Sequence, residues 1–229
     1  MATWVVHMRV AEIILGKYDI GKAAFLAGNI GPDCGVPDET WFGFTPSKTV
    51  THWMIGDERN GENIHDEAFY SEYIKGYSNI DLRDSRYAFL LGYYAHLLTD
   101  MEWSKMIHLQ ISRDTDFGCR FREDPEFIWE VKRDWYGLDF KYLADNPGNI
   151  FETLFNRIDS MPEYLDYFPE GALMRQIRYI QKFYGTKNDW VNNEFKYLTE
   201  NEMNDFVGNT GAKILKRFDQ ILHGFGCIA

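Results

Sequence analysis

The chain has 229 residues, of which 45% are hydrophobic and 17% aromatic, so it carries ample material for one large core. Its formal net charge is -11, from 35 acidic and 24 basic residues, and this charge disfavours nucleic acid and anionic membrane surfaces as partners. Cys34, Cys119 and Cys227 are widely spaced and form no CxxC pair. Neither a disulfide framework nor a thiolate zinc site is therefore expected.

No apolar run approaches the roughly 20 residues that a transmembrane helix needs. The first residues, MATWVVHMRVAEII, lack the basic region and the small-residue cleavage site of a secretion signal. We therefore expect a cytoplasmic protein. No internal repeat or linker-like composition marks a boundary, so residues 1–229 are expected to form a single helical domain.

The N-terminal segment predicts two helices and a loop. Helical periodicity covers Trp4 to Lys17 and places His7 on the apolar face. A second helix is expected from about Asp19 to Gly28, and the glycines and proline of GNIGPD stop it just before Asp33. Asp33 to Lys48 (DCGVPDETWFGFTPSK) has no period and predicts a long ordered loop, of a length that is often functional.

The stretch Tyr87 to His108 (YAFLLGYYAHLLTDMEWSKMIH) reads as one long helix, in which His96 and Asp100 lie four residues apart on an apolar stripe. Such a stripe normally faces a core. An aspartate there is costly to bury unless it is neutralised, and a metal ion shared with His96 would neutralise it. The alternative is that the two side chains bond to each other or to backbone groups of the core, and the spacing alone does not decide.

The C-terminal half predicts further helices. Arg113 to Glu123 reads as a charged loop, and Asp124-Pro125-Glu126 as the start of a helix that runs to about Tyr136 and stops at Gly137. The other helices are expected at Asp66 to Tyr77, Asp139 to Asp145, Ile150 to Ser160, Glu170 to Tyr184 and Thr199 to Leu222, the last opened by a capping box from Thr199 to Glu202. Strand patterns are almost absent. The expected class is all-α, a compact multi-helix bundle of about seven to nine helices.

Three stretches resemble the bacterial zinc-dependent phospholipase C family: AFLAGNIGPD (Ala24 to Asp33), Thr51-His52, and LLGYYAHLLTDMEW (Leu90 to Trp103). The resemblance covers the N-terminal half. It implies a helical bundle, shared with a single-strand nuclease, that encloses a cluster of zinc ions. It also implies that the metal ligands are an N-terminal histidine, the aspartate of the GNIxPD-like segment, a further histidine, and the two residues of an HxxxD pair. The corresponding residues are His7, Asp33, His52, His96 and Asp100.

The family's remaining ligands are a histidine shortly after the HxxxD pair and an HxxxE pair on the following helix. His108 is suitably placed for the first, but the next helix has no histidine and offers Glu130 and Asp134 four residues apart. These carboxylates would make a more oxygen-rich site. The family's secreted members also use the amine of their processed N-terminal residue, and we do not expect Ala2 to reach the site.

The resemblance implies a metal-dependent phosphoric-ester hydrolase, a phosphodiesterase of the phospholipase C type with one to three zinc ions. Zinc lowers the pKa of water from 15.7 to about 7, and paired ions clamp the oxygens of a phosphodiester. A phospholipid or small-molecule phosphodiester would be the substrate, and Asp33 would be both a ligand and the catalytic general base. Several aromatic side chains either line a pocket for the headgroup or belong to the core. They are Trp41, Phe42, Phe44, Trp53 and Tyr94.

Three other interpretations remain open. His52, His65-Asp66 and Asp100 resemble the H…HD…D set of another class of phosphohydrolase, but the intervals are short, and Asp66 reads more simply as a helix cap. The protein is alternatively a non-catalytic metal-binding bundle that acts through a partner, an interpretation motivated by the altered second site. A single-strand nuclease is the third, and the acidic net charge disfavours it.

Overall fold

The computed structural model describes residues 1–39, 43–56, 60–77, 81–186, 188–192 and 194–223. Within these ranges the protein has ten α-helices and one two-stranded sheet, which confirms the all-α class. The α-helices are α1 (Trp4–Lys17), α2 (Lys22–Ile30), α3 (Lys48–Thr51), α4 (Asp66–Phe69), α5 (Ser85–Arg113), α6 (Thr115–Glu123), α7 (Phe127–Asp145), α8 (Ile150–Thr153), α9 (Ala172–Tyr184) and α10 (Glu200–His223).

Short elements connect these helices. The single-turn helices are η1 (Gly31–Asp33), η2 (Gly61–Asn63), η3 (Tyr70–Ile74), η4 (Phe155–Arg157) and η5 (Asp189–Asn192). In the segment predicted to be a long loop, β1 (Val36–Pro37) pairs antiparallel with β2 (Phe44–Thr45), with Val36 opposite Thr45.

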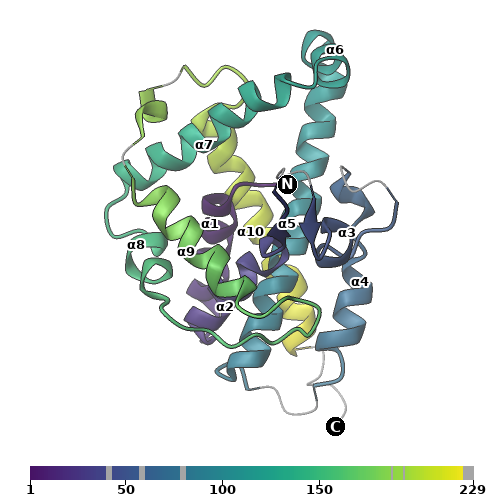
Figure 1. Cartoon of the computed structure of the whole chain (residues 1–229), viewed down its shortest axis with the longest axis vertical. Helices are drawn as coiled ribbons and strands as arrows, with labels where there is room; N and C mark the ends of the chain where they lie inside the picture. Colours follow the sequence, from purple (N-terminus) through teal and green to yellow (C-terminus); the bar gives the residue numbers. More distant parts are fainter. Residues whose placement is uncertain (40–42, 57–59, 78–80, 187, 193, 224–229) are drawn as a thin grey trace.

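The long helix α5 forms the axis of the molecule (Figure 1). It packs against α1, α2 and α10, while α7, α8 and α9 lie on one side of this group and α3 and α4 on the other. Asp84 starts α5 because its side chain accepts a hydrogen bond from the backbone N–H of Tyr87 at 2.8 Å. From this cap onward, α5 carries its central residues, including His96 and Asp100, through the buried core.

The close approach of α2 and α5 depends on two glycines. A Cβ atom on Gly28 would lie 1.9 Å from the carbonyl oxygen of Phe89, and one on Gly92 would lie 2.0 Å from that of Phe25. Only a residue without a side chain fits at either point. The crossing brings the carbonyl oxygen of Asn29, at the end of α2, to 2.8 Å from His96 Nδ1. The packing of these two helices therefore sets the position of His96.

Two predictions about individual helices are confirmed. The helix predicted from Trp4 to Lys17 has those bounds. The capping box also forms, since Thr199 N donates to Glu202 Oε2 at 2.8 Å and Glu202 N donates to Thr199 Oγ1 at 3.3 Å.

The region predicted to be a charged loop, Arg113 to Glu123, contains the helix α6 instead. Asp114 caps it by accepting a hydrogen bond from Phe117 N at 3.0 Å, and Phe117 is buried. The prediction was wrong because the charged residues of this segment lie on the exposed side of a short amphipathic helix.

Helix α7 differs from its prediction at both ends. It begins at Phe127, two residues after Pro125, because Asp124 forms a turn in which its Oδ1 accepts from Glu126 N at 3.0 Å. It also continues through Gly137 to Asp145. Gly137 is buried there, and tertiary packing outweighs its low helix propensity.

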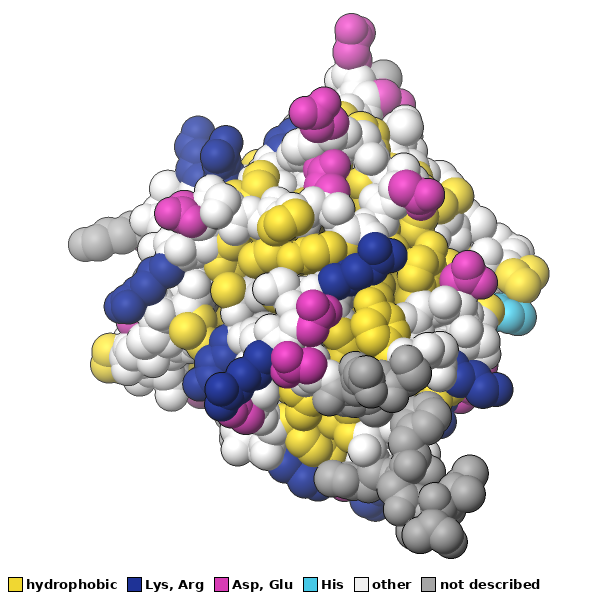
Figure 2. Space-filling view, turned by 90° about the horizontal axis from the view of Figure 1, so that it is seen from below, with side chains coloured by type: hydrophobic (Ala, Val, Ile, Leu, Met, Phe, Trp, Pro, Cys, Tyr) yellow, Lys and Arg dark blue, Asp and Glu magenta, His cyan; other side chains and the backbone are white. Residues whose placement is uncertain are grey.

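In the described part of the chain, no helix is long and apolar enough to cross a membrane. On the face seen in Figure 2, acidic and basic side chains are interspersed among hydrophobic ones.

Asp139, on α7, ties the start of the chain to α9. Its Oδ1 accepts a hydrogen bond from Thr3 Oγ1 at 2.7 Å, and its Oδ2 accepts one from Tyr184 OH at 2.5 Å. The side chain is buried. Burial raises the pKa of Asp139 to about 7, and the hydrogen bonds from Tyr184 and Thr3 offset only part of that rise.

We predict that Gly92→Ala destabilises the protein by about 3 kcal/mol or more, because the new methyl group would overlap the Phe25 carbonyl. Gly208→Ala is the matched control, since nothing lies within 4 Å of its Cβ position on α10. That change should stabilise the protein by about 0.5 to 1 kcal/mol. Urea unfolding measures both, and a Gly92→Ala variant as stable as the wild type would refute the close approach.

We also predict that Asp139 makes the stability of the protein depend on pH. Between about pH 4 and pH 7 the folded state keeps a proton on Asp139 that the unfolded state has lost, so the stabilising contribution of this group falls as the pH rises. Relative to the wild type, Asp139→Asn should therefore gain stability from pH 4 to pH 8. Urea unfolding at several pH values tests this, with the exposed Asp159→Asn as control. An equal pH profile in all three proteins would contradict it.

Candidate metal centre

Five of the predicted ligands lie together, on four separate segments. His7 is on α1, Asp33 ends η1, His52 directly follows α3, and His96 and Asp100 are one turn apart on α5. His7, His52, His96 and Asp100 are fully buried. All five residues, including Asp33, form what we call the His/Asp cluster.

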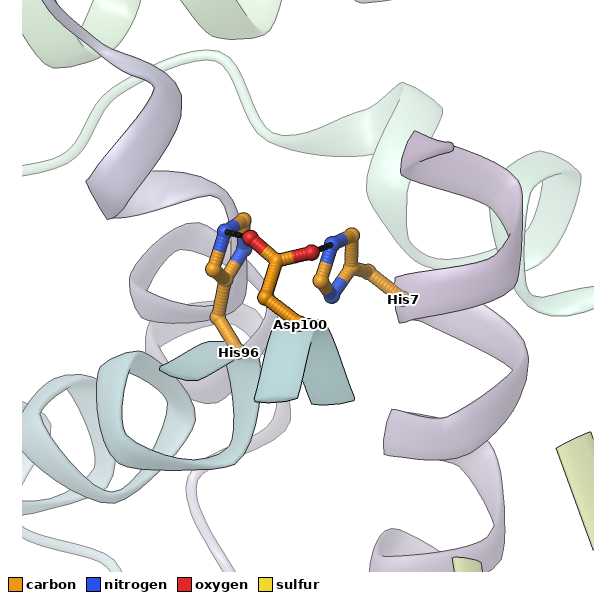
Figure 3. Close-up of side chains that lie close together, drawn as sticks. All are labelled: His7, His96 and Asp100. Atoms are coloured by element: carbon orange, nitrogen blue, oxygen red, sulfur yellow. Dashed lines mark ion pairs between the residues drawn. The ribbon is translucent and has the colours of Figure 1, made fainter. Parts of the chain in front are cut away.

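Asp100 is at the centre of the His/Asp cluster. Its Oδ1 lies 3.3 Å from His7 Nε2, and its Oδ2 lies 3.2 Å from His96 Nε2. Figure 3 shows the carboxylate between the two imidazole rings, one oxygen directed to each. Oδ2 is also 3.5 Å from His52 Nε2. One carboxylate thus contacts three imidazoles.

Asp33 extends the cluster on the other side of His52. Its Oδ1 lies 3.5 Å from His52 Nε2, which is 3.4 Å from His96 Nε2. Two overlapping sets therefore have all their ligand atoms within 4.8 Å of one another. One is His7, His96 and Asp100, and the other is Asp33, His52 and His96.

Two of the three imidazole rings, those of His96 and His52, are oriented by contacts outside the cluster. His96 Nδ1 lies 2.8 Å from the carbonyl oxygen of Asn29, and since a carbonyl only accepts, Nδ1 carries the proton and Nε2 faces the cluster. His52 Nδ1 lies 3.0 Å from Thr51 Oγ1. The rings of His7 and His96 stack, with centroids 3.8 Å apart and planes within 2°. Fixing the distal nitrogen of an imidazole in this way is typical of metal-binding histidines.

Several polar atoms of the cluster are buried without a hydrogen bond, which indicates that the cluster can bind a cation. Both ring nitrogens of His7 and Oδ2 of Asp100 are buried and make no hydrogen bond in the described part of the structure. An unsatisfied buried polar group costs about 1 to 3 kcal/mol. A cation placed among these atoms would satisfy them, and a set of imidazole nitrogens and carboxylate oxygens suits zinc. The residues present therefore fit a zinc ion.

The protonation states of His7 and Asp100 agree with this fit. Burial, together with the neighbouring His96, lowers the pKa of His7 to about 4, although Asp100 acts in the opposite direction. Burial alone would raise the pKa of Asp100, but the imidazoles of His96 and His7 outweigh it and hold that pKa well below its usual range. At neutral pH, His7 is a neutral imidazole and Asp100 an ionised carboxylate, the states in which these groups bind metals.

The N-terminal segment contacts both carboxylates of the cluster. Ala2 N–H donates a hydrogen bond to Asp100 Oδ1 at 2.8 Å, so the backbone amide of Ala2 lies at the site. The expectation that the free amine of Ala2, after removal of Met1, does not reach the site stays a prediction. Trp4 Nε1–H donates to Asp33 Oδ2 at 2.8 Å. The sequence analysis did not identify Trp4, and the only available signal was its place one turn before His7 on the same helix.

The other three predicted ligands lie away from the cluster. His108 is exposed on α5, with Nδ1 3.0 Å from Glu62 Oε2. On α7, Glu130 Oε2 accepts a hydrogen bond from Tyr197 OH at 3.0 Å, and Asp134 Oδ2 accepts one from Tyr197 N at 2.8 Å. Among the described residues, no group of potential metal ligands contains any of the three. The structure therefore does not bring them to the site.

The residues of the alternative H…HD…D set are also separated. His65 is exposed, and Asp66 is the first residue of α4 rather than its cap. Asp66 Oδ2 accepts a hydrogen bond from Tyr94 OH at 3.0 Å. Neither residue belongs to a group of potential metal ligands in the part of the chain that the structure describes.

A cavity of about 390 Å³ adjoins the His/Asp cluster. Asp33, Ala2 and Trp4 belong to its lining, so the cavity opens onto the cluster from the side of Asp33. Of the aromatic residues considered for a headgroup pocket, Phe44 lines the cavity, whereas Trp53 and Tyr94 pack in or against the core. Trp41 and Phe42 lie outside the described residues.

Comparison with known proteins gives one finding. A family model described as zinc dependent phospholipase C matches residues 6–216, a range that contains all five residues of the His/Asp cluster. The match also spans the C-terminal helices, which the resemblance noted in the sequence did not cover. No significant match was found among curated proteins or solved structures. On the extent of this match, the chain belongs to the zinc-dependent phospholipase C family.

Proposed function

We propose that the protein is a zinc-dependent phosphoric-ester hydrolase that cleaves a phosphodiester of the phospholipid type. The observation that carries this proposal is the buried His/Asp cluster opening into a cavity beside Asp33. His7, His52, His96, Asp33 and Asp100 would hold one or two zinc ions. Bound zinc supplies Lewis acidity, which polarises a phosphoryl oxygen and acidifies an attacking water molecule.

Asp33 is the residue we assign as general base. Its side chain is 16% exposed, whereas those of Asp100, His52 and His96 are at 0%, so it is the cluster carboxylate that substrate and water can reach. Burial alone would raise the pKa of Asp33, but the nearby imidazoles of His52 and His96 outweigh it and hold that pKa below its usual range, so Asp33 stays ionised. Since a carboxylate of low pKa is a weak base, the contribution of Asp33 depends on its position next to the attacking water.

A hydrogen bond from Trp4 and the contact with His52 keep Asp33 in place. Trp4 Nε1–H donates to Oδ2, which leaves Oδ1 directed toward His52.

Two aromatic residues that line the same cavity, Trp129 and Tyr179, are 61% and 43% exposed. Exposed aromatic side chains at a cavity mouth suit contact with the interfacial part of a lipid. A phospholipid therefore fits the cavity better than a wholly polar substrate.

The second candidate function is non-catalytic zinc binding. It is favoured by the separation of His108, Glu130 and Asp134 from the cluster, which leaves two overlapping sets of ligands within the described residues. Turnover distinguishes it, since a non-catalytic protein would bind zinc without cleaving any phosphodiester.

We predict that the protein purified without chelators or a histidine tag contains one or two equivalents of zinc, measured by elemental mass spectrometry. Asp100→Asn should lose the metal, because Asp100 is the carboxylate shared by the three imidazoles. At zinc concentrations 100-fold above Kd, the metal should add about 2.7 kcal/mol to the free energy of unfolding of the wild type. His108→Gln is the control and should keep both properties. Zinc retained by Asp100→Asn would refute the assignment.

We predict that Asp33→Asn lowers kcat for a soluble phosphodiester by about 100-fold or more, since general bases contribute about 10² to 10⁴. The variant should still fold, because the Asn carbonyl can still accept from Trp4. Asp66→Asn is the control and should keep wild-type turnover. Undiminished turnover in Asp33→Asn would remove this residue from the mechanism, and no turnover in the zinc-loaded wild type would favour the non-catalytic function.

A further inference from the structure

The cavity beside the His/Asp cluster is positively charged in a protein whose net charge is -11. Its charged side chains are those of Lys48, Lys132, Arg175 and Asp33. The three cations come from α3, α7 and α9, which are far apart in the sequence. Asp33 belongs to the cluster, so no other carboxylate among the described residues balances these cations within the cavity.

The two lysines have no anionic partner. Both are half-buried, and among the residues that the structure describes neither has a carboxylate oxygen within 4.0 Å. Lys132 Nζ lies 4.7 Å from the ring centroid of Trp129, and Lys48 Nζ lies 5.7 Å from that of Phe44. Each ammonium is thus held over an aromatic face that also lines the cavity.

Arg175 also has an unused donor. Its Nη2 donates to the carbonyl oxygen of Gly35 at 3.0 Å, which fixes the guanidinium against the loop that follows η1. Its Nε is buried and has no hydrogen-bond partner in the described structure. A buried guanidinium N–H without an acceptor is costly, and an anion in the cavity would supply the acceptor.

The charges are close enough to affect one another. Burial lowers the pKa of the Lys132 ammonium, Lys48 lowers it further, and Asp33 raises it. Like charges that are partly removed from water repel each other unless an anion lies between them. The cavity therefore favours an anion beyond what the cluster itself would bind.

We propose that this cavity binds a second anionic group of the substrate, so that the preferred substrate is a phosphodiester with an anionic headgroup rather than a cationic or zwitterionic one. This inference rests on the proposed function. The reacting phosphate would lie at the His/Asp cluster, and Lys48, Lys132 and Arg175 would hold a carboxylate or second phosphate on the headgroup. A quaternary ammonium would instead be repelled by these three cations. Trp129 and Phe44, two of the aromatic residues that line the cavity, already have a lysine over one face.

The test compares two substrates that differ by one carboxylate, dihexanoyl phosphatidylserine and dihexanoyl phosphatidylethanolamine, below their micellar concentrations. The zinc-loaded wild type should show a kcat/KM ratio of about ten or more in favour of the serine lipid. Lys48→Gln and Lys132→Gln should bring the ratio close to one, while Lys132→Arg, which keeps the charge, should preserve it. Lys22→Gln, on the exposed surface of α2, is the matched control and should leave the ratio unchanged.

A binding measurement separates this inference from the proposed function. Calorimetry on the metal-free protein should show tighter binding of glycerophosphoserine than of glycerophosphoethanolamine, and Lys132→Gln should abolish the difference. These deacylated esters also show whether the anionic group is recognised without a lipid. If neither lipid is hydrolysed but the binding preference holds, the anion site stands and the hydrolase proposal falls. Hydrolysis with a ratio near or below one, and equal binding of the two esters, would overturn the anion site.

Discussion

The burial of the Asp100 carboxylate is the constraint on which the rest of the structure depends. Transferring an ionised carboxylate out of water costs several kcal/mol even after the protein relaxes, and removing its partners exposes that cost. The partners of Asp100 are the Ala2 amide and the imidazoles of His7, His52 and His96. They come from the chain start, α1, the end of α3 and α5 itself, so these segments must assemble together for the charge to be tolerated. The folding of the core and the formation of the site are consequently one event.

The positions of the imidazoles follow from backbone packing more than from the side chains themselves. Gly28 and Gly92 let α2 and α5 touch, and that contact brings the Asn29 carbonyl to His96. On the opposite side, Asp139 binds Thr3, one residue before the Trp4 that donates to Asp33. If the proposed ligands bind a metal, side chains already held by such contacts would lose less entropy on binding it.

The helical period explains which parts of the site the sequence could predict. His96 and Asp100 were identified because a four-residue spacing on an apolar stripe fixes both the face and the burial. The same spacing placed Glu130 and Asp134 on one face of α7, but it could not predict which part of the molecule that face contacts. Both side chains bind Tyr197 instead of joining the cluster. The cationic cavity was not predictable, because it joins single residues from α3, α7 and α9 that show no pattern along the chain.

The charge distribution also bears on the substrate of the proposed hydrolase. A long polyanion such as single-stranded nucleic acid would have to lie across the surface of a protein of net charge -11, and its many phosphates would be repelled. A small anionic headgroup inside the cavity is affected chiefly by the charges within about one Debye length, roughly 8 Å at physiological salt. Lys48, Lys132 and Arg175 line the cavity. For the proposed hydrolase, the acidic net charge is compatible with an anionic substrate whose charged part the cavity can enclose, and a phospholipid headgroup meets this condition better than a nucleic-acid strand.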